Sequence, residues 1–107
     1  MSITLTVDDK KTLELALDCW GAEAQIGMAY EELGELITAL NHFKRGRIGE
    51  YELASEVADV LIMVNQLSIL VGPQVVQDQI IFKMDRLRQR LRDRKSTRLN
   101  SSHQYYL

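Results

Sequence analysis

The sequence predicts an all-α protein, an antiparallel bundle of four helices. Proline occurs once in 107 residues, apolar residues recur at spacings of three and four, and β-branched residues are scattered rather than alternating. With 46% hydrophobic and 26% charged residues, the composition is that of a folded domain and not of a disordered chain. The length suits one domain, which we place at residues 1–92.

The first expected helix is short and begins after Thr6. Asp8 and Asp9 follow at once, where acidic side chains favour the positive N-terminal end of a helix. The apolar positions of this helix run through to Trp20, and Gly21 offers a break.

The second expected helix spans residues 22–44 and stops at Gly46. Its predicted buried stripe has the spacing of one helix face and consists of Ile26, Tyr30, Leu33, Ile37 and Leu40.

The third expected helix spans residues 50–71 and is ended by Gly72-Pro73. Its predicted inward positions are Leu53, Val57, Val60, Leu61, Val64 and Leu67. A fourth helix is expected over residues 74–92, and the short connections favour antiparallel neighbours.

The last fifteen residues have a different character. The string DRKSTRLNSSH, residues 93–103, resembles the translation of a common sequencing-library adapter. We therefore expect residues 93–107 to be an artefactual, disordered tail without a function.

Charge and composition exclude several classes of function. The net charge of −2 argues against a nucleic-acid polymer as partner, and a single cysteine cannot form an internal disulfide. The longest uninterrupted apolar run, Val60–Val64, is far shorter than the ~18 residues of a membrane span. These features predict a cytoplasmic protein that does not contact a membrane.

The second and third helices share a pattern of acidic residues. Glu32 and Glu35 are separated by two residues, as are Glu56 and Asp59, and each pair lies on an apolar flank of its helix. Clustered carboxylates away from water cost several kcal/mol each unless they are neutralised. With only oxygen ligands, the neutralising ion is expected to be Mg²⁺, with Mn²⁺ second. The alternative is that these acids face solvent and pair with arginines of the fourth helix.

These motifs resemble the signature of the MazG-like all-α nucleotide pyrophosphohydrolases. The matching strings are EELGE at residues 31–35 and EVAD at residues 56–59, and the likeness covers about residues 13–92. It implies that Glu32, Glu35, Glu56 and Asp59 bind Mg²⁺, and that Glu31 is an additional acid of the catalytic site. It also implies Mg²⁺-dependent hydrolysis of nucleoside triphosphates between the α- and β-phosphates, giving a monophosphate and pyrophosphate.

Four further residues are candidates for substrate binding. Lys83 and Arg86 resemble the basic positions of the family that hold phosphates; the alternative is that they are surface partners of nearby acids. Trp20 is placed to stack on a nucleobase, or else belongs to the core. Gln25, on the flank of Glu32, is placed to reach substrate or a metal-bound water, or else is an exposed amide.

The resemblance implies a homodimer or a dimer of dimers, with the nucleotide site at the interface. The sequence favours the same assembly, because the third helix is apolar almost all round and a domain of this size buries only about two-thirds of its surface. The bundle is therefore expected to be completed by homodimerisation.

Two alternatives remain open: an enzyme like the phosphoribosyl-ATP pyrophosphohydrolases, and a non-catalytic helical dimerisation module. A di-iron carboxylate protein is set aside because no histidine follows a glutamate at the required spacing.

Overall fold

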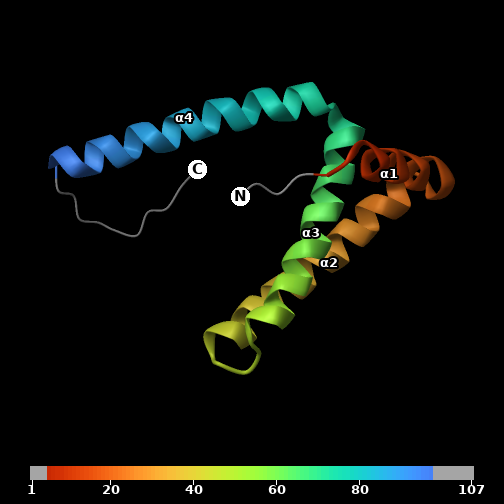
Figure 1. Cartoon of the computed structure of the whole chain (residues 1–107), viewed down its shortest axis with the longest axis horizontal. Helices are drawn as coiled ribbons and strands as arrows, with labels where there is room; N and C mark the ends of the chain where they lie inside the picture. The colour runs from red at the N-terminus through yellow and green to blue at the C-terminus, as the bar shows by residue number, and fades with distance from the viewer. Residues whose placement is uncertain (1–4, 98–107) are drawn as a thin grey trace. The chain divides into compact units, whose positions relative to one another are not determined.

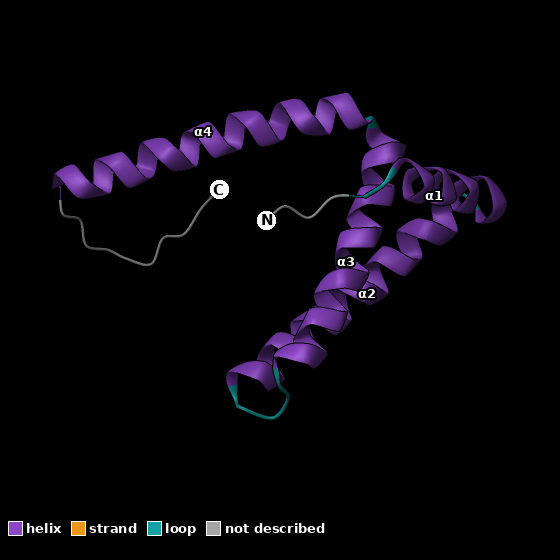
Figure 2. Cartoon of the chain, viewed as in Figure 1, coloured by secondary structure: helices purple, strands orange, loops and turns teal. Residues whose placement is uncertain are grey.

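The computed structural model describes residues 5–97, and within them the chain forms four α-helices and no strand. Figure 2 shows these helices and the short turns between them. They are α1 (Val7–Trp20), α2 (Ala22–Lys44), α3 (Glu50–Val71) and α4 (Pro73–Thr97). The all-α prediction is confirmed for this part of the chain.

The helix bounds follow the sequence signals closely. The ranges 22–44 and 50–71 agree with the predicted second and third helices. The fourth helix continues five residues beyond Arg92, to Thr97, so the segment expected as a disordered tail begins as helix. Residues 98–107, the rest of that segment, lie outside the described residues.

The chain divides into two units, Met1–Val71 and Gly72–Leu107. Helices α1, α2 and α3 belong to the first unit, where each contacts the other two. Figure 1 shows α2 and α3 side by side along their length, joined by the turn at residues 45–49. Helix α4 makes up the described part of the second unit, so a bundle of all four helices stays a prediction.

Helix α1 begins at a reciprocal cap. The Thr6 hydroxyl accepts from the Asp9 backbone N–H at 3.0 Å, and the Thr6 backbone N–H donates to the Asp9 carboxylate at 2.9 Å. The hydrogen bonds from Thr6 hold the pKa of the Asp9 carboxyl below its usual range. The helix ends at Gly21, whose φ of +88° is costly for a residue with a side chain.

Few apolar side chains of α2 and α3 are fully buried. The buried residues of α2 are Gln25, Ala29 and Ala39, and those of α3 are Met63 and Gln66. The two alanines leave room for the helices to approach closely. The core of this unit is therefore thin, and two of its five buried residues are amides.

The predicted apolar stripe of α2 does not face α3, which corrects the sequence-based expectation. Ile37 is 62% exposed and Tyr30 74% exposed, while Ala29 at the helix contact is 4% exposed. On α3, Val57 and Val64 are exposed as well, whereas the other four predicted inward residues are half-buried: Leu53, Val60, Leu61 and Leu67. Periodicity finds the most apolar face, but the contact in this unit uses the adjacent face, which carries small and polar residues.

One expectation for the end of α1 is also wrong. Trp20 was placed in an apolar stripe, yet it is 65% exposed. Its neighbour Cys19, a residue type that is most often buried, is exposed and has a free thiol. Both residues lie in the last turn before Gly21, where the chain turns into α2.

Among the described helices, α3 alone is long and apolar enough, by length and composition, to cross a membrane. Its mean hydropathy reaches 1.5 although no uninterrupted apolar run is long. A core helix of a soluble protein can have the same length and hydropathy. Two acidic residues, Glu56 and Asp59, lie within α3.

Candidate metal centre

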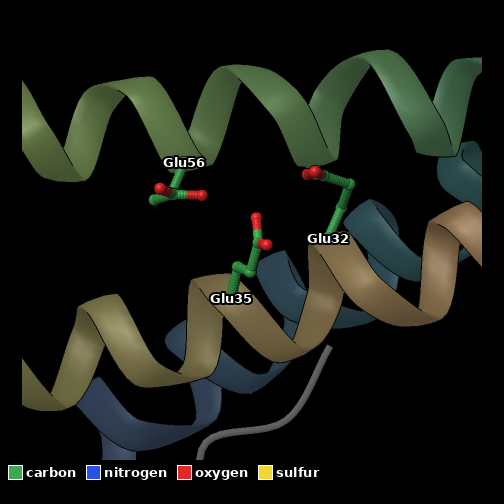
Figure 3. A group of neighbouring side chains, drawn as sticks. All are labelled: Glu32, Glu35 and Glu56. Carbon is green, nitrogen blue, oxygen red and sulfur yellow. The ribbon is translucent and has the colours of Figure 1, made fainter.

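Three glutamates from two helices converge in the first unit. Glu32 and Glu35 lie one turn apart on α2, and Glu56 comes from α3. Each offers a carboxylate oxygen, and these three oxygens lie within 4.8 Å of one another. Figure 3 shows the side chains directed into the space between the two helices. Three of the four predicted metal ligands are therefore brought together.

Two of these three carboxylates are partly withdrawn from solvent. Glu32 and Glu56 are half-buried, whereas Glu35 is exposed. Glu32 Oε2 and Glu56 Oε1 are shielded from solvent and have no hydrogen-bond partner. Burial raises the pKa of the Glu32 carboxyl, and the charges of Glu35, Asp59 and Glu56 raise it further.

The remaining predicted acids lie beside this cluster. Asp59 is half-buried on α3 and near enough to Glu32 for its charge to act on the pKa of that residue. It is not among the three residues whose oxygens converge. Glu31 is exposed on α2 and lines the groove described next.

An open groove of about 670 Å³ lies beside the cluster and includes two of its glutamates. Residues from α2, α3 and the turn between them line it: Tyr30, Glu31, Gly34, Glu35, Thr38, Ala39, His42, Ile48, Glu52 and Glu56. Four of these residues are acidic, and one oxygen of Glu52 accepts a hydrogen bond from the Gly49 backbone N–H at 3.0 Å. An anionic ligand entering this groove needs accompanying cations.

Gln25 is placed differently from either sequence-based interpretation. It is 8% exposed, so it is not an exposed amide, and its Nε2 donates to Gln66 Oε1 at 2.7 Å. Gln66 is 2% exposed, and its own Nε2 donates to the Leu13 carbonyl oxygen of α1 at 3.0 Å. These two amides connect all three helices of the unit. A contact between Gln25 and substrate stays a prediction.

The predicted phosphate-binding residues belong to the second unit. Lys83 is an exposed residue of α4, and the Arg86 guanidinium lies over the Phe82 ring at 5.7 Å from its centroid. The roles of Lys83, Arg86 and Trp20 in substrate binding stay predictions.

Sequence reasoning missed several residues around the site. The spacing of Gln66 could have indicated its place beside Gln25, because Gln66 follows Asp59 by seven residues just as Gln25 precedes Glu32 by seven. Tyr30 was assigned to the core and instead lines the groove, as do Thr38, His42 and Glu52. These groove residues come from different turns of two helices, so no local motif marks them.

The residues present suit a hard divalent cation. The donors are all carboxylate oxygens, the ligand type that Mg²⁺ and Mn²⁺ prefer. Two of the oxygens are shielded from water and lack a hydrogen-bond partner, a condition that a bound cation relieves. Exposed Glu35 leaves the group accessible from one side.

No protein-family model, curated protein or solved structure matches this chain.

Proposed function

We propose that this protein is a Mg²⁺-dependent hydrolase that cleaves nucleoside triphosphates to a monophosphate and pyrophosphate. The observation that supports this most is the convergence of Glu32, Glu35 and Glu56, with two orphaned oxygens between α2 and α3. The EELGE and EVAD strings that resemble the MazG-like signature contain these residues.

The acids have distinct proposed roles. Glu32 and Glu56 hold the cation from the helix contact, Glu35 holds it from the exposed side, and Asp59 completes the set from α3. Glu31 faces the groove and holds a water or a second cation. Mn²⁺ is expected to substitute for Mg²⁺, because both accept oxygen ligands in similar geometry.

The proposed chemistry relies on charge and position. When bound, Mg²⁺ neutralises the carboxylates, binds phosphate oxygens and acidifies a water. The carboxylates keep the cation at the edge of the groove, and the groove walls orient the nucleoside end of the substrate. Lys83, Arg86 and Trp20 are the proposed further contacts to substrate, whereas buried Gln25 is paired with Gln66.

The proposed enzyme is a cytoplasmic homodimer or dimer of dimers that contacts neither a membrane nor a nucleic-acid polymer. Exposed apolar residues of both helices support the assembly: Ile26, Leu33, Ile37 and Leu40 of α2 and Val57 and Val64 of α3. The apolar character of α3 makes vesicle binding the measurement that tests the membrane part of this proposal.

Metal binding is tested by thermal unfolding. Saturating Mg²⁺ or Mn²⁺ is expected to raise Tm by about 10 °C, because the cation binds the folded state alone. Glu35→Gln removes one ligand charge and is expected to abolish most of this increase. Glu23→Gln, an exposed acid on the same helix, is the matched control and keeps the increase. An unchanged Tm in the native protein contradicts the metal site.

The reaction is tested by product analysis. The protein is incubated with Mg²⁺ and a panel of ribo- and deoxyribonucleoside triphosphates and phosphoribosyl-ATP, and products are separated by chromatography. Monophosphate and pyrophosphate are expected, with turnover about 100-fold lower for Glu35→Gln and Asp59→Asn. Cleavage of phosphoribosyl-ATP alone supports the related enzyme class. Diphosphate and phosphate as products contradict the proposed bond.

A non-catalytic dimerisation module is the second candidate, and the same exposed apolar residues of α2 and α3 favour it. This candidate predicts dimers, no metal-dependent change in Tm, and no turnover of any nucleotide.

A further inference from the structure

We propose that the Gln25–Gln66 pair sets the register of α2 against α3 and thereby brings the carboxylates together. Both glutamines act in this way as positioning residues, through the helices that carry them. The consequence for metal binding rests on the proposed function, whereas the register itself is a property of the fold that can be measured without metal.

The pair is well suited to specify one arrangement. Its hydrogen bond is short, at 2.7 Å, and joins residues 41 positions apart in the sequence. Both side chains are buried, so a helix that slides breaks the bond and leaves polar groups without water or partner. Gln66 also donates to the Leu13 carbonyl, so the glutamine pair is connected to α1 as well.

The spacing along both helices connects this pair to the acids. Glu32 lies seven residues after Gln25, and Asp59 lies seven residues before Gln66. Seven residues are about two helical turns, so each glutamine lies above an acid on the same side of its helix. Glu35 and Glu56 lie three residues further along in each case. When the glutamines pair, the acids of α2 are set opposite those of α3.

Of the apolar residues in the two helices, the few that are fully buried specify register weakly, and Leu36, Leu53, Val60, Leu61 and Leu67 are half-buried. Apart from the amides, the buried side chains are Ala29, Ala39 and Met63. Alanines offer little shape to interlock, and methionine adapts to irregular space. The acids themselves repel one another and oppose this register in the absence of metal. A buried polar pair is a known means of fixing the register of packed helices, at some cost in stability.

A purely structural role predicts a different outcome from a register role. If the pair only satisfies two buried amides, then the double variant Gln25→Leu/Gln66→Leu leaves neither amide unpaired and, besides the pair, removes only the side-chain hydrogen bond to the Leu13 carbonyl. Its stability is then close to or above that of the native protein, and its metal site is intact. If the pair sets register, the same variant stays folded but binds metal poorly.

The first measurement is Mn²⁺ affinity, which is determined from the paramagnetic resonance signal of free Mn²⁺. We expect the double leucine variant to be helical by circular dichroism and to bind Mn²⁺ about tenfold or more weakly. Asn65→Leu is the matched control, because the Asn65 amide is half-buried on α3 but donates within its own helix, to Leu61 O at 2.8 Å. This control is expected to keep native affinity.

The second measurement reads the register directly and needs no metal. Spin labels are attached in a Cys19→Ser background through Glu23→Cys on α2 and Val71→Cys on α3, both at exposed positions. Labelled protein is diluted with unlabelled protein, so that distances within one chain dominate. We expect one narrow distance with the glutamines present, and in the double leucine variant a broadened distribution shifted by up to about 5 Å, one helical turn.

The outcomes separate this proposal from the proposed function. An unchanged distance distribution in the double leucine variant overturns the register role, whatever the metal data show. A changed distribution in a protein that never binds Mn²⁺ supports the register role and refutes the metal site. Native Mn²⁺ affinity in a variant with a changed distribution overturns the link between register and carboxylates.

Discussion

The Glu32 carboxyl lies where burial and three neighbouring acids all oppose ionisation. Its pKa in the folded protein is raised above the value in the unfolded chain. The folded state therefore binds the proton more tightly, and ionised Glu32 lowers stability at every pH above its folded pKa. This cost disappears as pH falls through the folded pKa toward the unfolded value.

This shift predicts an unusual pH dependence for the metal-free protein. Lowering the pH through the raised pKa of Glu32 toward the ordinary value of a glutamate is expected to raise Tm, because Glu32 takes up its proton in the folded state. Glu32→Gln is expected to be more stable than native at the higher pH and to lose this dependence. Thermal unfolding at several pH values in the presence of a chelator measures both. A native Tm that falls steadily on acidification contradicts the prediction.

At the scale of the helices, the α2–α3 pair has two unlike flanks. Residues that follow the contact residues by one position lie about 100° further around each helix. Apolar residues of both helices fall there on the same flank, because antiparallel helices carry equivalent positions on one side. This apolar flank consists of Ile26, Leu33, Ile37 and Leu40 of α2 and Val57 and Val64 of α3, all more than a third exposed. Glu31 and His42, which line the groove, lie on the opposite side of α2.

The apolar flank predicts how the protein assembles. The double variant Leu33→Glu/Ile37→Glu is expected to turn the dimer into a monomer, because it would bury two charges without partners. Ala24→Glu, an exposed position toward the other flank of α2, is the control and leaves the dimer intact. Sedimentation velocity measures the mass of each. A native protein that sediments as a monomer contradicts the proposed assembly.

At the scale of the whole chain, the first unit is poorly supplied with buried apolar residues. Ala29, Ala39 and Met63 are the buried apolar side chains of the described residues, far fewer than a stable domain of this size needs. This deficit agrees with a fold that is completed by a further surface.

The sequence by itself determined the helices and the acids. Thr6, Gly21, Gly46 and Gly72 mark helix ends through local backbone preferences, and such preferences act within a few residues. The paired motifs on α2 and α3 were visible for the same reason, since acids three residues apart lie on one face of any helix.

The tertiary structure alone decided which faces meet. Hydrophobic periodicity placed Ile26, Leu33 and Ile37 at the core, yet α3 packs on the neighbouring face of Gln25, Ala29 and Ala39. When two faces of a helix can both pack, the sequence of that helix does not determine which neighbouring element covers each face. The amide pair, the groove and the convergence of three glutamates depend on residues far apart in sequence, so the packing of α2 against α3 determines them.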